Sequence, residues 1–192
     1  YKLKRFTSND GVKVALYSVD EPTAPTTDGA TTIDVAGSTF TDAYGNNNSA
    51  ATQFNWTFDS TTPTMTITSA EVSNGATSND TTLSLTFTSS EAITGFAEGD
   101  ITVSGGTLSD FAQTSPTIYT AILTPSGDGA ITIDVASSAF TDSAGNDNSA
   151  ATQFNWAFNS TRPTLSSSTP ADGATGVAAD ANIVLTFSEV VE

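Results

Sequence analysis

The sequence predicts an all-β protein made of tandem β-sandwich modules, and three observations carry this prediction. The segments between turns are short, rich in Thr, Val, Ile and aromatic residues, and alternate with a period of two, which is typical of strands. No sustained period of 3.6 residues occurs, so no long helix is expected. Residues 31–64 and 131–164 are also identical at 25 of 34 positions. Such an internal repeat points to a tandem array.

Seven strands are expected between residues 61 and 162. They cover residues 64–70, 81–88, 100–104, 107–112, 117–124, 130–136 and 153–158. Seven short strands in about 100 residues, with turn signals between them, fit an immunoglobulin-like sandwich. Phe154, Trp156 and Phe158 fall on one face of the last strand, which favours a core position for Trp156 over a ligand platform.

Two joints of the same design divide the chain. "FDSTTPT" (58–64) and "FNSTRPT" (158–164) each carry a proline, Pro63 or Pro163, that keeps the preceding strand from running into the next one. The expected organisation is tandem immunoglobulin-like β-sandwich modules, one complete and flanked by incomplete ones. The latter part of one module occupies 1–60, a complete module occupies 61–162, and the N-terminal part of a further module occupies 163–192. The chain is expected to be a piece of a longer array.

The first 24 residues stand apart from the repeat. At an offset of 100 residues, only Thr7 and Asp10 of this segment recur. The segment also holds four of the five basic residues of the chain. It is either foreign to the module or a strand pair that has diverged quickly, and the sequence leaves both interpretations open.

Composition limits the chemistry of the chain. The net charge is −16, and no Lys or Arg occurs from residue 14 to 161, where 16 Asp and Glu residues occur. Such a surface repels nucleic acid and anionic membranes and attracts cations. No apolar run is long enough to span a bilayer, so membrane insertion is not expected. The absence of His and Cys excludes Ser–His and Cys–His nucleophilic catalysis and a conventional zinc site within this chain. A paired-carboxylate glycosidase is not excluded by composition.

Several motifs resemble a known family. "SEAITGFAEGDITVSGGTLSDF" and "AFTDSAGNDNSA" in residues 61–162 resemble the bacterial Ig-like repeats of large secreted adhesins and biofilm-associated surface proteins, and residues 25–60 do so more weakly. "SSSTPADGATGVAADANIVLTFSEVV" looks like the start of the related Ig-like module of S-layer proteins and exoenzymes. The resemblance implies an extended, non-enzymatic, often calcium-dependent stalk that is secreted or held at the bacterial cell surface.

Acidic and amide residues converge at one pole of the expected sandwich. The loop at 137–152, the loop at 89–100 and the joint before the module meet there in a seven-strand sandwich. Carboxylate and amide oxygens are the ligands that Ca²⁺ takes, usually six to eight of them. The candidate ligands for Ca²⁺ are Asp59, Glu91, Asp100, Asp142, Asn146 and Asp147.

Turn chemistry is the competing interpretation of the repeated loop. Asn, Asp and Gly are the default residues of turns, and the loop lacks the spacing of an EF-hand. At the second joint Asn159 replaces Asp59, while Glu189 matches Glu91. A weaker site is therefore expected there.

The expected function is mechanical rather than enzymatic. The chain would be a spacer in a bacterial adhesin, with neighbouring Ig-like modules of the same chain as its partners and calcium controlling the stiffness of the joints. The ligand at the tip of such an adhesin is not defined by this sequence. One alternative is an accessory module of a secreted polysaccharide-active enzyme, and another is a module that itself binds glycan or protein.

Overall fold

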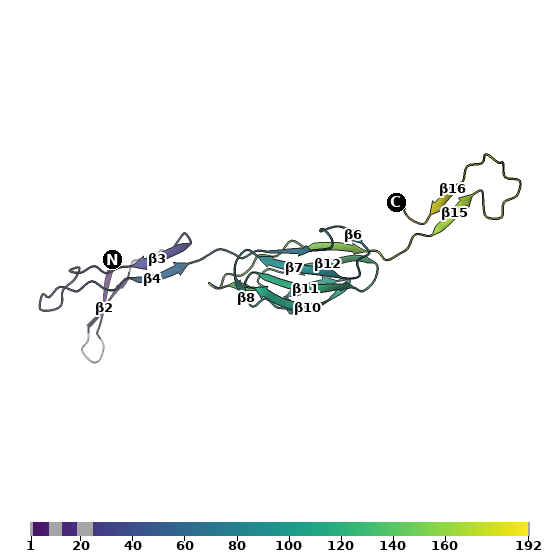
Figure 1. Cartoon of the computed structure of the whole chain (residues 1–192). Coiled ribbons are helices and arrows are strands. Elements are labelled where there is room, and N and C mark those ends of the chain that lie inside the picture. The colour runs from purple at the N-terminus through teal and green to yellow at the C-terminus, as the bar shows by residue number, and fades with distance from the viewer. Residues whose placement is uncertain (1, 8–12, 19–24, 192) are drawn as a thin grey trace.

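The computed structural model describes residues 2–7, 13–18 and 25–191. Its central part is a β-sandwich that lies between two thinner segments (Figure 1). We call residues 25–58 the N-terminal segment, residues 59–64 the linker, and residues 65–158 the sandwich. Among the described residues, no helix is long and apolar enough to cross a membrane.

Two four-stranded sheets form the sandwich. The first has the order β10-β11-β7-β5, and all its pairs are antiparallel. Its strands are β5 (Met65–Ser69), β7 (Leu83–Ser89), β10 (Gly106–Ser115) and β11 (Ile118–Pro125). The second has the order β6-β14-β12-β9. Its strands are β6 (Thr77–Ser78), β9 (Ile101–Ser104), β12 (Gly129–Val135) and β14 (Phe154–Phe158). The expected all-β fold class is confirmed.

The first strand of the sandwich differs from the prediction, because the chain changes sheets there. The single strand expected at 64–70 is β5, which pairs with β7, and the chain then forms β6, which runs parallel to β14. Asn74 secures the crossing: its Oδ1 accepts from the Asn155 N–H at 2.7 Å and its Nδ2 donates to the Gln153 carbonyl at 3.2 Å. No hydrophobic pattern marks such a two-residue strand, so periodicity could not find it.

One strand is longer than predicted, and three short elements, β8, β13 and η1, were not predicted. β10 extends beyond the expected 107–112, and it contains a bulge near Asp110, whose φ is 53°. A bulge on an edge strand disturbs its unpaired hydrogen-bonding row and discourages pairing with another chain. A small sheet of β8 (Ile93–Thr94) and β13 (Thr141–Asp142) lies at one end of the sandwich, and a 3₁₀ turn, η1, spans Glu98–Asp100.

The core follows from the alternation of each strand. Alternate residues of β7, Leu83, Leu85 and Phe87, are buried, and those of β12 face them from the other sheet. Trp156 is 1% exposed, and its indole N–H donates to the Ser78 hydroxyl at 3.0 Å. This bond satisfies the one polar atom of the ring, so the core position predicted for Trp156 is confirmed.

The turn between β9 and β10 requires glycine at residues 105 and 106, because a side chain at either position would contact the backbone of a neighbouring strand. A Cβ on Gly105 would lie 2.8 Å from the Ala130 carbonyl oxygen, and one on Gly106 would lie 2.9 Å from that of Thr124. Gly105 also has a φ of 80°. The chain can therefore pass from one sheet to the other closely only because both residues are glycine.

The described strands outside the sandwich form antiparallel pairs. β3 (Gly29–Ile33) pairs with β4 (Phe54–Phe58), and β15 (Leu165–Thr169) pairs with β16 (Val184–Phe187). Within the atypical residues 1–24, β1 (Lys2–Thr7) pairs with β2 (Lys13–Ser18) in a sheet of their own. Residues 1, 8–12 and 19–24 lie outside the described part, and both interpretations of this segment stay predictions.

Equivalent aromatic residues of the repeat differ in burial. Phe154 is 2% exposed, whereas Phe54 is 62% exposed; Trp156 is 1% exposed, whereas Trp56 is 37% exposed. β12 and β14 are covered by the first sheet, whereas β3 and β4 form a two-stranded sheet. Burial at these positions is thus set by the opposing sheet and not by the local sequence.

This difference makes a matched pair of substitutions informative. Phe154→Ala is expected to lower the free energy of unfolding of the sandwich by about 3–5 kcal/mol, because it leaves a cavity in a close-packed core. Phe54→Ala is expected to change it by less than about 0.5 kcal/mol. Urea unfolding of the full chain measures both, and equal losses would contradict the assignment of the core.

Candidate calcium-binding joint

The amide-rich loop between β12 and β14 is held by one buried side chain. Asn148 is 2% exposed. Its Oδ1 accepts from the N–H groups of Ala139 and Phe140 at 2.7 and 3.0 Å, and its Nδ2 donates to the carbonyls of Ala136 and Ser149. These four bonds close the long loop onto its own base and satisfy backbone groups that the strands leave unpaired.

A second set of bonds shapes the tip of the same loop. Asp142 is 3% exposed. Its Oδ1 accepts from the N–H groups of Ala144, Gly145 and Asn146 at 2.7–2.9 Å, and its Oδ2 accepts from the Asn146 side chain at 2.8 Å. The turn needs a left-handed residue, and Gly145 supplies it with a φ of 94°. Turn chemistry therefore accounts for much of the repeated motif.

The linker brings a further carboxylate to this loop. The Asn146 Nδ2 donates to the backbone carbonyl of Asp59 at 3.1 Å. Glu91 lies in the turn between β7 and β8, where the Ser89 hydroxyl donates to the Glu91 carbonyl. Because β8 pairs with β13, Ile93 lies opposite Asp142, and the two turns meet.

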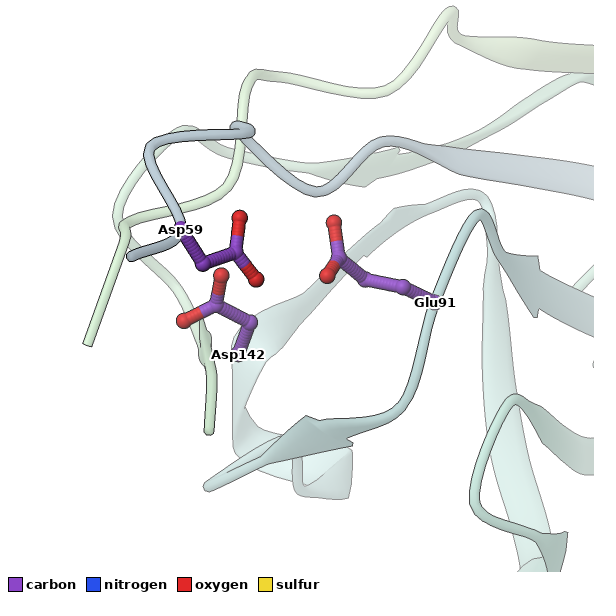
Figure 2. Close-up of side chains that lie close together, drawn as sticks. All are labelled: Asp59, Glu91 and Asp142. Atoms are coloured by element: carbon purple, nitrogen blue, oxygen red, sulfur yellow. The ribbon is translucent and has the colours of Figure 1, made fainter. Parts of the chain in front are cut away.

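Three carboxylates meet at this point, and we call them the acidic cluster. Asp59, Glu91 and Asp142 each offer an oxygen, and these oxygens all lie within 4.8 Å of one another. Figure 2 shows the three side chains pointing toward one another from the linker, the β7–β8 turn and β13. Asp142 is buried, and the other two are half-buried.

The charges in the cluster are uncompensated by basic side chains of the sandwich. No Lys or Arg occurs between residues 14 and 161. Burial raises the pKa of the Glu91 carboxyl, and the negative charges of Asp59, Asp142 and Asp28 raise it further. The bond from the Asn146 side chain lowers the pKa of Asp142, and backbone N–H bonds add to this effect against the opposing effect of burial. Asp142 is thus held ionised, while Glu91 is pushed toward protonation.

The other three predicted ligands lie differently. Asn146 contacts the cluster as a hydrogen-bond donor to Asp142 and to the linker. Asp100 accepts the Ala97 N–H at 2.8 Å and caps the η1 turn. Asp147 is exposed, and its backbone bridges Thr141. Asp100 and Asp147 are outside the group of three carboxylates whose oxygens converge.

The second joint shares part of this design. The Asn159 Oδ1 accepts from the Thr161 N–H at 3.0 Å, just as the Asp59 Oδ1 accepts from that of Thr61. The Glu189 Oε1 is buried and has no hydrogen-bond partner. In the part of the chain that the structure describes, only the first joint gathers three carboxylates.

Sequence reasoning missed another feature of both joints. The Asp28 Oδ1 accepts from the N–H and hydroxyl of Ser60, each at 2.7 Å, and its Oδ2 accepts from the Thr61 hydroxyl at 2.6 Å. Asp128 makes the same three bonds with Ser160 and Thr161. The only signal in the sequence is that all three residue types recur at the same offset as the rest of the repeat.

The fold and the repeated joint define a class of tandem β-sandwich modules. Residues 59–158 match the family of bacterial Ig-like domains, and residues 159–192 match a second family with the same description. The chain therefore belongs to the bacterial Ig-like domains, as the sequence motifs predicted. Comparison with curated proteins gives no match, and comparison with solved structures gives none. Domains of this family are typically structural modules without catalytic activity.

The buried amide of the loop gives the first prediction for the site. Asn148→Asp keeps the acceptor but removes both donors and places a carboxylate oxygen against two carbonyls. We expect a loss of roughly 2–4 kcal/mol in the free energy of unfolding, because buried groups lose their partners. Asn148→Ala is a second test, since it removes all four bonds without adding a charge. An unchanged urea midpoint in both variants would show that the loop does not depend on this side chain.

The pKa of Glu91 gives the second prediction. A carboxyl whose pKa is raised by folding stabilises the folded state fully below its unfolded pKa of about 4.3, and this contribution is lost as pH rises through the folded pKa. In a chelating buffer at pH 7, Glu91→Gln should therefore raise the free energy of unfolding by about 0.5–1 kcal/mol. The gain should vanish at pH 4. The exposed Glu98→Gln is the matched control for net charge, and a gain of equal size there would refute a local origin.

Proposed function

We propose that this chain is a spacer in a bacterial adhesin that is secreted or held at the cell surface, and that Ca²⁺ stiffens its first joint. The convergence of Asp59, Glu91 and Asp142 within 4.8 Å carries the proposal. Two of the three side chains belong to the sandwich and one to the linker, so an ion held by all three would tie the linker to the sandwich.

The donor set suits calcium better than magnesium. Three carboxylates can each bind through one or both oxygens, and Ca²⁺ accepts six to eight oxygens in a flexible geometry. Mg²⁺ demands a tight octahedron and keeps several waters. Hydrogen bonds keep Asp142 ionised, as a ligand must be. A cation would also relieve the repulsion among three negative charges that have no basic neighbour in the sandwich.

The surface of the sandwich supports a passive spacer over the alternative functions. Between residues 61 and 162, no large hydrophobic side chain is among the exposed ones. A glycan-binding face or a sugar-cleaving cleft would require exposed aromatic rings. Phe96, Phe111, Tyr119 and Phe140 instead contact one another in and around the core. Bacterial Ig-like domains are commonly extracellular or at the cell surface, which agrees with a stalk.

Thermal unfolding of the full chain with Ca²⁺ and with a chelator tests the proposal. A ligand that binds only the folded state stabilises it by roughly 2.7 kcal/mol at a hundred times its Kd. A small domain gains about 4–8 °C in midpoint for each kcal/mol. We expect such a rise with Ca²⁺, and not with Na⁺ at equal ionic strength.

Two variants localise the effect. Asp59→Asn gives the first joint the residue that the second joint carries, and it should remove most of the rise. Glu98→Gln changes an exposed carboxylate of the same region and should keep it. An unchanged midpoint of the wild-type chain in Ca²⁺ would refute the calcium site and leave a spacer whose joints are set by Pro63, Pro163 and hydrogen bonds.

A further inference from the structure

The linker is bound to the N-terminal segment through one aspartate. Asp28 lies in the turn that precedes β3, and both of its carboxylate oxygens are taken up by Ser60 and Thr61. The three distances, from 2.6 to 2.7 Å, are those of strong hydrogen bonds to an ionised acceptor. The two residues of the linker are thereby fixed relative to the β3–β4 hairpin.

The residues on either side of this pair are bound to the sandwich. The Asp59 carbonyl accepts from Asn146 at 3.1 Å, and the Pro63 carbonyl accepts from the Ser149 N–H at 3.1 Å. Thr64 exchanges bonds with Ser90: its N–H donates to the Ser90 hydroxyl, and its carbonyl accepts from the Ser90 N–H. The Pro63 side chain is fully buried.

The two sets of bonds alternate along the linker. Residue 59 is bound to the sandwich, residues 60 and 61 to the N-terminal segment, and residues 63 and 64 to the sandwich again. A swing of one side against the other must therefore break bonds within a stretch of six residues. A linker whose first part was bound only to the N-terminal segment and whose second part was bound only to the sandwich would leave a free hinge between the two parts.

The bonds to Asp28 also fix the residue next to them. Asp59 directly precedes Ser60, so its backbone is held between the Asn146 amide and the Asp28 carboxylate. Its carboxylate points to Glu91 and Asp142 (Figure 2). The orientation of the side chain that the linker contributes to the acidic cluster thus depends on bonds made outside the cluster.

We propose that Asp28 is a positioning residue. Its hydrogen bonds to Ser60 and Thr61, which we call the latch, hold the first joint without a metal and orient Asp59 toward Glu91 and Asp142. The second joint repeats the hydrogen bonds with Asp128, although Asn159 stands where Asp59 would be. The latch therefore recurs independently of the acidic cluster. Only the presentation of Asp59 to a cation rests on the proposed function.

The latch is tested in a chelating buffer on the full chain. The sequence has no Cys, so spin labels can be attached through Thr57→Cys on β4 and Thr102→Cys on β9, both exposed positions. Pulsed EPR then gives the distribution of distances across the joint. Asp28→Ala should broaden this distribution, and Thr61→Val, which removes only the hydroxyl donor, should broaden it less. Asp128→Ala, which removes the same bonds at the other end of the sandwich, should leave it unchanged.

Two results in chelator would overturn the latch. One is a distribution in Asp28→Ala as narrow as in the wild type. The other is equal broadening by Asp128→Ala, which would show a general loss of order. The urea midpoint of the sandwich serves as a folding control, because Asp28 lies outside the core and its substitution should leave that midpoint in place.

A Ca²⁺ titration of the same variants tests the positioning role. Loss of a residue that orients a metal ligand typically weakens metal binding by about 10–100-fold. We expect a loss in this range for Asp28→Ala, a smaller loss for Thr61→Val, which removes a bond to Asp28 without removing a charge, and none for Asp128→Ala. Unchanged Ca²⁺ affinity in Asp28→Ala overturns the positioning role. If the wild type does not bind Ca²⁺, both the positioning role and the proposed function are overturned. The widths of the EPR distance distributions in chelator then still test the latch.

Discussion

The buried amide of Asn148 is the interaction on which the joint depends. A loop of this length that contains only the two-residue strand β13 is uncommon in a compact domain, and it needs internal bonds to keep one conformation. Asn148 supplies four bonds at the base of the loop, and Asp142 supplies four at its tip. Because the tip is fixed, Asn146 can donate to the linker and Asp142 can meet Glu91. Core packing alone places β12 and β14 but leaves this loop undefined.

The two copies of the repeat separate local from tertiary causes. Asn48 and Asp42 make nearly the same bonds as Asn148 and Asp142, although among the described residues β3 and β4 pair only with each other. The conformation of the loop is therefore determined by its own residues, as expected for side chains that bond to nearby backbone groups. Burial of the aromatic residues behaves in the opposite way, since Phe54 and Phe154 share a local sequence but not an environment. This contrast explains which features the sequence could predict.

Strands with a clear period of two were found from the sequence, and the convergence of Asp59, Glu91 and Asp142 followed from the order of loops in a sandwich. The change of sheet between β5 and β6 was not predicted, because the side chain of Asn74 makes hydrogen bonds to β14 and its flanking residue there that a longer strand would make with its backbone. The latch was missed for a related reason. Asp28 and Ser60 are 32 residues apart, and only the pairing of β3 with β4 brings the ends of that hairpin together. Contacts of this kind leave no helix or strand periodicity in a sequence.

Electrostatics and hydrogen bonding act on the joint in different ways. The bonds made by Asp28 engage both oxygens of its carboxylate and lower its pKa, chiefly through Thr61 and then Ser60. The acidic cluster is the reverse, because its charges oppose one another and raise the pKa of Glu91. By our proposal, the hydrogen bonds of Asp28 hold the joint whether or not a cation is present, whereas the repulsive cluster gains most in stability when a cation binds. An asparagine at the position of residue 59 removes the carboxylate that the cluster needs and leaves these bonds in place, since Asp128 still binds Ser160 and Thr161 at the joint that carries Asn159. In an array where each module contacts only its neighbours, stiffness is set joint by joint. Under the proposed role of calcium, one substitution per joint would be enough to decide which joints respond to a cation and which are held by hydrogen bonds alone.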